Sequence, residues 1–81
     1  MQISYDPEAD AMYVDLTEPQ GQVRSDRIDH QRILDYDESG TLFGIEFLFV
    51  SEGLRIADLP QADAIRELLA SLRSIPQPAS A

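Results

Sequence analysis

The chain of 81 residues contains no cysteine, no tryptophan and no lysine, and it has a single histidine. Without cysteine it can form neither a disulfide nor a thiolate metal site. Its longest apolar run covers residues 47–50, far short of the roughly 20 residues that a membrane-spanning helix needs. The first residues lack the basic and apolar regions of a signal peptide. We therefore expect a soluble, cytoplasmic protein.

Negative charge dominates the residues that are present. Fifteen acidic residues against six arginines give a net charge of −9 at pH 7 and an isoelectric point near 4.2. Repulsion by phosphate groups argues against nucleic acid and anionic membranes as partners. The whole net charge belongs to residues 1–58, because residues 59–81 hold two acids and two arginines. The two parts are therefore predicted to form different structural elements.

The hydrophobic pattern predicts one small α+β domain over residues 1–75. Alternating apolar and polar residues indicate an antiparallel sheet of four to five strands joined as hairpins, at 2–5, 11–16, 22–28, 31–37 and 42–50. The polar strand 22–28 is expected at an edge, where its charges discourage edge-to-edge aggregation. Apolar residues at helical spacing predict one C-terminal helix over 60–75, packed on one face of the sheet. Residues 76–81 are expected to be a disordered tail.

The segment 42–50 is the most apolar strand of the pattern. Alternation places Phe43, Ile45, Phe47 and Phe49 on one face and Leu42, Gly44, Glu46, Leu48 and Val50 on the other. A single helix covers only part of one face, so apolar residues on the other face indicate an interface. The residues expected there are Leu48, Val50, Phe49 and Met12. Association as a homodimer, or with another protein, would also stabilise so small a domain.

Two stretches resemble signatures of a known family. They are Tyr5-Asp6-Pro7-Glu8-Ala9-Asp10-Ala11-Met12-Tyr13, and Ile33-Leu34-Asp35-Tyr36-Asp37-Glu38-Ser39-Gly40 followed by Gly44-Ile45-Glu46. They are similar to the YDPExDAxY and ILDYDxxGxxxGIE hairpin motifs of a family of small prokaryotic domains of unknown function. The resemblance covers about residues 2–52 and implies no chemistry. Because some members are encoded beside small toxin-like proteins, it implies an antitoxin-like role with a small basic protein as partner.

One string in the second stretch matches a calcium loop. Oxygen-bearing side chains stand at positions one, three and five, glycine at six and glutamate at twelve, which makes Asp35, Asp37, Ser39 and Glu46 the candidate ligands. An EF-hand requires flanking helices, whereas strands are predicted on both sides. A hairpin would carry Glu46 along the strand and away from the turn. We therefore favour a turn built by Asp37 and Gly40 over a cation site.

A second acidic group, Asp6, Glu8 and Asp10, lies within five residues. Such carboxylates could hold a metal, or divide acid and base roles by shifting each other's pKa. The alternative is turn chemistry, with Asp6 bonded to nearby backbone and Asp10 closing the turn. We favour the turn, because exposed acids in turns are mostly solvated.

Two single residues complete the candidates. His30 lies in a polar loop with no nucleophile motif beside it, and it is predicted to be a surface residue. Glu46 shares a face with Leu48 and would need a partner there, for which Arg24, Arg27 and Arg32 are the candidates.

Three functions are compatible with this pattern. The favoured one is a non-catalytic, acidic protein-interaction module without a cofactor, which binds itself or a basic protein partner. The second is a metal-binding protein or metal-dependent enzyme that uses the turn carboxylates. The third is a purely structural homodimer.

Overall fold

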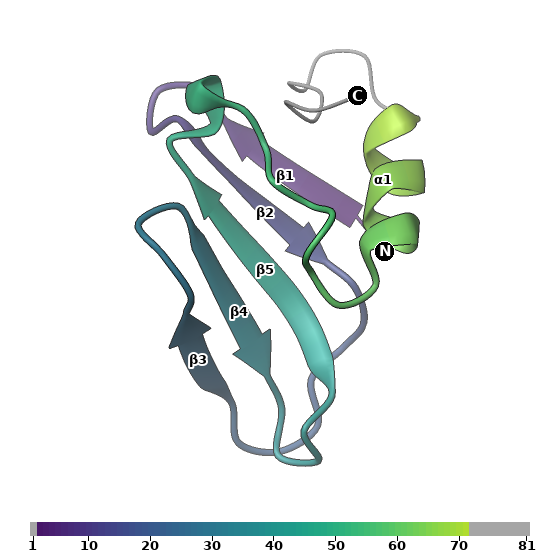
Figure 1. Ribbon diagram of the computed structural model, residues 1–81. Coiled ribbons are helices and arrows are strands. Elements are labelled where there is room, and N and C mark those ends of the chain that lie inside the picture. The colour runs from purple at the N-terminus through teal and green to yellow at the C-terminus, as the bar shows by residue number, and fades with distance from the viewer. Residues whose placement is uncertain (1, 72–81) are drawn as a thin grey trace.

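The computed structural model describes residues 2–71. They form five strands and one α-helix (Figure 1). The elements in chain order are β1 (Gln2–Asp6), β2 (Ala11–Asp15), β3 (Arg24–Arg27), β4 (Arg32–Tyr36), β5 (Leu42–Leu48), a 3-10 turn (Val50–Glu52) and α1 (Ala62–Ala70). No helix within this part of the chain is long and apolar enough to cross a membrane.

All five strands belong to one antiparallel sheet in the order β1-β2-β5-β4-β3. The predicted α+β fold, a small antiparallel sheet with one C-terminal helix, is confirmed. The apolar strand β5 lies at the centre, where both faces need side chains that tolerate burial. The polar strand β3 lies at an edge and all four of its residues are exposed, as its charge pattern predicted.

Several element boundaries differ from the prediction, and backbone conformation explains two of them. Strand β5 ends at Leu48 because Phe49 takes a left-handed conformation with φ 53°. Helix α1 begins at Ala62 because the preceding Gln61 has φ 60°. The predicted helix end at residue 75 and the predicted tail at 76–81 lie outside the described residues.

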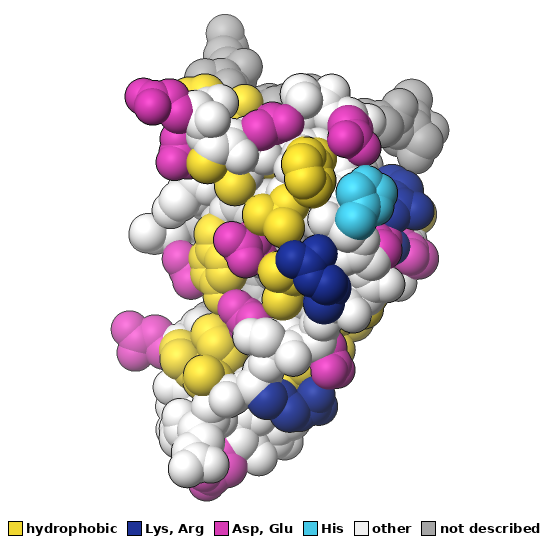
Figure 2. Space-filling view, turned by 90° about the vertical axis from the view of Figure 1, so that its left-hand side faces the viewer, with side chains coloured by type: hydrophobic (Ala, Val, Ile, Leu, Met, Phe, Trp, Pro, Cys, Tyr) yellow, Lys and Arg dark blue, Asp and Glu magenta, His cyan; other side chains and the backbone are white. Residues whose placement is uncertain are grey.

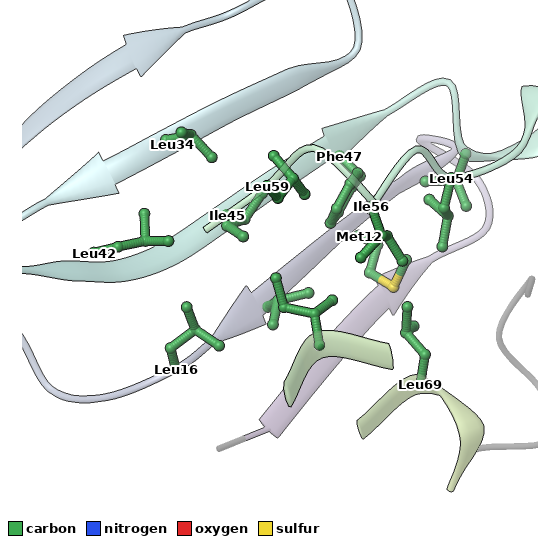
Figure 3. Close-up of a cluster of buried hydrophobic side chains, with 13 residues drawn as sticks. Met12, Leu16, Leu34, Leu42, Ile45, Phe47, Leu54, Ile56, Leu59 and Leu69 are labelled. Atoms are coloured by element: carbon green, nitrogen blue, oxygen red, sulfur yellow. The ribbon is translucent and has the colours of Figure 1, made fainter. Parts of the chain in front are cut away.

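The core lies between one face of the sheet and the chain that follows β5. We call this the covered face. Residues of β2, β5 and β4 pack there against the linker and α1, in a cluster of Met12, Val14, Leu16, Leu34, Leu42, Ile45, Phe47, Val50, Leu54, Ile56, Leu59, Ile65 and Leu69. Figure 3 shows Leu69 of α1 pointing toward Met12 of β2. Ile65 and Leu69 of α1 are buried, at the helical spacing that the sequence predicts.

A bulge in β5 changes which side chains share a face. Asp35 pairs with Gly44 but Tyr36 pairs with Leu42, so Phe43 is an extra residue in the ladder. This shift brings Leu42 into the core cluster, to which Phe43 does not belong. The predicted alternation is thus wrong at the start of β5 and correct for Ile45 and Phe47.

Two residues expected at an interface are core residues instead. Met12 is 1% exposed and Val50 is 0% exposed. Val50 follows the sharp backbone turn at Phe49, which redirects the chain and returns this side chain to the covered face. A correction follows: neither Met12 nor Val50 can contact a partner without unfolding part of the core.

Candidate functional site

The face of the sheet opposite α1 is not covered by any element of residues 2–71, and we call it the uncovered face. Directly paired residues of an antiparallel sheet share a face, so the strand register identifies its members. They are Gln2, Ser4, Asp6, Ala11, Tyr13, Asp15, Gly44, Glu46, Leu48, Ile33, Asp35, Ser25 and Arg27. Figure 2, which looks onto the side away from α1, shows hydrophobic side chains interspersed with acidic ones and arginines.

A hydrogen-bonded group crosses this face at its centre. The Tyr13 hydroxyl donates to Asp35 Oδ2 at 2.7 Å, and the Ser25 hydroxyl donates to Asp35 Oδ1 at 2.6 Å. The tyrosine reaches Asp35 by lying across Gly44, where an added Cβ would stand 1.9 Å from the phenol oxygen. Gly44 is therefore required by close approach of a side chain. The group fixes Tyr13 flat against the sheet and presents its ring to the outside.

Charge on the uncovered face is strongly unbalanced. It carries four acidic side chains, Asp6, Asp15, Asp35 and Glu46, and one arginine, Arg27. Burial, then the hydrogen bond to Asp35 and the charges of Asp35, Asp15 and Glu46, raises the pKa of Tyr13 above its ordinary value of 10.0. The phenol therefore stays neutral and remains a donor. The face presents an acidic, partly apolar surface to any partner.

A shallow hollow of about 210 Å³ opens on this face. Its lining includes Ser4, Asp6, Ala11, Tyr13 and Glu46, so apolar surface lies beside two carboxylates. Long cationic side chains place a hydrocarbon stem on apolar surface and keep the charged head near polar groups. The hollow offers both surfaces, an apolar one for the stem and two carboxylates for the charged head.

Glu46 has no ion-pair partner in the part of the chain that the structure describes. Of its three expected partners, Arg24 and Arg32 lie on the covered face by strand register. Arg27 shares the face of Glu46 but donates to the carbonyl of Asp29 at 3.1 Å. None of the three expected arginines therefore pairs with Glu46 within residues 2–71.

The hairpin divides the candidate calcium ligands, with Asp37 and Ser39 in the turn and Asp35 and Glu46 on the sheet. Asp37 is 4% exposed and accepts from the backbone N–H groups of Ser39 and Thr41 at 3.0 Å each, and from that of Gln20 at 3.1 Å. Asp35 binds Tyr13 and Ser25 on the sheet. Residues 2–71 bring together no group of three or more histidine, aspartate or glutamate side chains suited to a metal ion. Asp37 thus builds the turn.

The turn acids of the β1–β2 hairpin also have separate partners. Asp6 Oδ1 accepts from the N–H groups of Glu8 at 3.0 Å and Ala9 at 3.3 Å, the bonding of an Asx turn. Asp10, with φ 53°, accepts from the N–H of Ser51 at 2.8 Å and from its hydroxyl at 2.7 Å. Asp10 therefore joins the hairpin to the chain after β5 rather than to Asp6.

Phe49 and His30 form an exposed aromatic pair beside the uncovered face. Phe49 is 48% exposed and its ring centroid lies 5.8 Å from that of His30. His30 Nε2 is 3.5 Å from Glu52 Oε1, and both side chains are more than half exposed, so His30 is the surface residue that was predicted. Leu48 is half-buried. Of the four residues expected at an interface, Leu48 and Phe49 remain.

Sequence reasoning missed Gln31 and Arg32 as organisers of the fold. Both are buried. The Gln31 amide donates to the carbonyls of Phe49 at 3.1 Å and Gly53 at 2.7 Å. These bonds hold Phe49 in a left-handed conformation that a bulky residue rarely adopts. No sequence motif marks such a contact, because donor and acceptor lie about twenty residues apart.

Arg32 fixes the linker between β5 and α1. Its five N–H groups are all used: three bonds reach the carbonyl of Arg55 (3.1 Å) and the carboxylate of Asp58 (2.6 and 3.2 Å), and two reach Asp29 Oδ2 (2.9 and 3.1 Å). These bonds lower the pKa of Asp29 and Asp58 below the ordinary value of 3.8. They also raise the pKa of Arg32, first through Asp58. We call this group of side chains the Arg32 cluster.

The model of the family described as "Protein of unknown function (DUF2283)" matches residues 2–51. The chain belongs to the DUF2283 family. This confirms the resemblance to a family of domains of unknown function, and the match ends one residue before the predicted limit. No curated protein and no solved structure matches the chain.

The DUF2283 match contains all five strands and therefore the whole uncovered face. It ends at Ser51, whose N–H and hydroxyl bind Asp10. The linker and α1 lie outside it. The part of this chain that is shared with the family is thus the sheet, and the uncovered face is built entirely from it.

Proposed function

We propose that this protein is a non-catalytic interaction module whose uncovered face binds a basic protein. The observation that carries the proposal is the acidic surplus on a partly apolar sheet face, with Glu46 lacking an arginine partner among residues 2–71. Charge complementarity speeds association and rejects acidic partners. The hollow beside Tyr13 receives a lysine or arginine side chain of the partner.

Several features support binding over catalysis. Ser25 donates to Asp35 and not to a histidine, and the one histidine is an exposed residue beside Glu52. Asp37, the most buried of the candidate acids, is fully occupied by backbone donors. Phe49 supplies an exposed aromatic side chain of a kind that is enriched at protein interfaces.

A hetero-complex is favoured over pairing of two uncovered faces. Two copies that met face to face would bring eight carboxylates and two arginines into one interface. Buried like charges oppose such an association. A small basic protein, as expected for an antitoxin-like role, meets the same face with the opposite sign.

The test uses the small basic proteins encoded beside the gene for this chain. Each is co-expressed with it, the complex is purified by a tag on either protein, and the dissociation constant is measured by calorimetry at two salt concentrations. We expect binding that weakens as salt rises. Glu46→Gln and Phe49→Ala should each weaken it at least about tenfold, which corresponds to about 1.4 kcal/mol.

Glu67→Gln provides the matched control, because Glu67 is an exposed acid on α1, away from the uncovered face. It should bind as the unchanged chain does. The proposal is refuted if no neighbouring gene encodes a small basic protein, if none co-purifies, or if Glu46→Gln and Glu67→Gln bind equally well.

A further inference from the structure

The outer edge of β3 presents an unpaired strand. Strand β3 pairs only with β4 among the elements described. Two of the three exposed large hydrophobic residues, Val23 at 57% and Ile28 at 44%, flank this strand at its two ends. An exposed strand edge is a template for pairing with another chain.

The hydrogen-bond register determines which backbone groups point outward. Ile28 N–H donates to the carbonyl of Arg32 at 3.0 Å. Because hydrogen-bonded pairs alternate along an antiparallel ladder, Asp26 and Arg24 also direct their backbone groups toward β4. The N–H and C=O groups of Ser25 and Arg27, and of Val23 before them, point away from the sheet.

The opposite side of β4 agrees with this assignment. Leu48 N–H donates to the carbonyl of Gln31 at 2.7 Å, and the same register continues through Ile33 with Glu46 and Asp35 with Gly44. The odd-numbered residues of β4 therefore bond to β5 and its even-numbered residues to β3. The outward groups of β3 have no strand to pair with.

Charge along β3 then selects one partner. We propose that β3 pairs antiparallel with β3 of a second copy of this chain, about a two-fold axis at Ser25. In this register Ser25 pairs with Ser25 of the second copy, and Val23 pairs with Arg27. Each Arg24 lies opposite Asp26 of the other copy. Opposite charges directly across a strand pair stabilise it.

The other symmetric registers lack this complementarity. A two-fold axis can pass through a hydrogen-bonded or a non-hydrogen-bonded pair of identical residues, so the alternatives to Ser25 are Val23, Arg24, Asp26 and Arg27. An axis at Arg24, Asp26 or Arg27 brings two like charges together, and like charges directly opposite each other destabilise a pair. An axis at Val23 places Arg24 opposite Gln22. The charges of β3 therefore oppose most edge pairings but favour the one register that has its axis at Ser25.

Arg24 and Asp26 already interact with each other within one chain. Within one chain Arg24 Nη1 lies 3.0 Å from Asp26 Oδ2, with both side chains about 60% exposed, and so exposed an ion pair stabilises little by itself. The Arg24 guanidinium also lies 4.6 Å from the centroid of the Tyr36 ring. Pairing two copies converts two exposed ion pairs into one group of four alternating charges, and Arg27 covers Val23.

The pairing goes beyond the proposed function, since it uses the edge and leaves the uncovered face open. Directly opposed residues share a face, so the two uncovered faces lie side by side on one continuous sheet. A dimer then offers two acidic sites in a fixed arrangement.

Sedimentation equilibrium over micromolar to millimolar concentrations tests the inference. The unchanged chain should shift from monomer to dimer as its concentration rises. Arg24→Asp and Asp26→Arg should each raise the dimer dissociation constant at least about tenfold, because each places like charges across the axis. An equimolar mixture of the two variants should recover the dimer, since every acid then faces an arginine.

Controls come from an equivalent exposed ion pair on α1, where Arg66 Nη1 lies 3.6 Å from Asp63 Oδ1. Arg66→Asp and Asp63→Arg make the same changes in net charge and should dimerise as the unchanged chain does. Val23→Pro removes one outward N–H without touching the β3–β4 ladder and should weaken the dimer. Circular dichroism verifies that each variant is folded.

A chain that stays monomeric at every concentration overturns the inference. So does a dimer that both single variants leave intact, or a mixture of variants that fails to associate. Binding of the basic protein by the monomeric Arg24→Asp variant separates this result from the proposed function, which depends on Glu46 and Phe49.

Discussion

Replacing Arg32 by methionine tests whether the Arg32 cluster holds the linker on the sheet. The Arg32 side chain is 6% exposed, and its guanidinium joins Asp29 before β4 to Asp58 and the Arg55 carbonyl in the linker. Methionine retains an apolar chain of similar length but donates no hydrogen bond. The substitution leaves two carboxylates and one carbonyl without their main donor.

The expected loss follows from the exposure of the groups left behind. Removing one partner of a buried ion pair destabilises a protein by about 3 to 5 kcal/mol. Asp58 is 65% exposed and can be hydrated, while Asp29 keeps its contact with Arg55. We therefore expect the lower end, about 3 kcal/mol, which for a domain of this size lowers the thermal midpoint by about 12 to 24 °C.

Urea denaturation followed by circular dichroism at pH 7 measures this difference. Arg55→Met is the matched control, because Arg55 is 55% exposed and its one ion pair among residues 2–71 is with Asp29; we expect a loss below about 1 kcal/mol. A loss below about 1 kcal/mol for Arg32→Met would show that the linker is held by apolar packing alone. Equal losses for the two variants would refute the role given to burial of Arg32.

Four further outcomes are expected. First, the folded state lowers the pKa of Asp29, Asp37 and Asp58 below 3.8, so the stability they contribute is full at pH 7 and is lost as the pH falls below 3.8; the unfolding free energy of Arg32→Met should depend less on pH in that range. Second, Gly44→Ala forces Tyr13 away from Asp35, and it should cost about 1 to 3 kcal/mol and lower the tyrosine pKa in an ultraviolet titration. Third, Asp37→Asn places an amide N–H against the Gln20 N–H or forfeits the Ser39 and Thr41 bonds, and a loss of about 1 to 3 kcal/mol should appear in the same denaturation assay. Fourth, millimolar calcium, magnesium or manganese should leave the thermal midpoint unchanged, whereas an upward shift would revive the cation site at Asp35 or Asp6.

The fold could be predicted because each strand and the helix has its own characteristic spacing of apolar residues. Alternation gave β2 and β5, and apolar spacing gave α1, since burial of one face determines both patterns. The prediction failed at Leu42 and Phe49, where the backbone leaves the regular strand. A bulge and a left-handed residue depend on tertiary contacts, such as the Gln31 amide on the Phe49 carbonyl, which a local pattern does not contain.

The candidate site was only partly accessible to sequence reasoning. The acidic character of the sheet and the turn roles of Asp6 and Asp37 followed from composition and turn chemistry. The contact of Tyr13 with Asp35 spans 22 residues and depends on Gly44 lying between them in the sheet. An isolated glycine within a strand does signal close approach, and it was the one mark of this group that the sequence carried.

The end of the family match at Ser51 has a consequence for how this architecture can vary. Five core residues that complete the covered face, Leu54, Ile56, Leu59, Ile65 and Leu69, all come after that point. The shared sheet therefore does not complete its own core. Its covered face needs apolar side chains from another part of the same chain or from another chain. Gln31 and Arg32 lie inside the match and donate hydrogen bonds to the backbone carbonyls of Phe49, Gly53 and Arg55. Every residue has a backbone carbonyl, so Gln31 and Arg32 can bind segments of different sequence at the same position after β5.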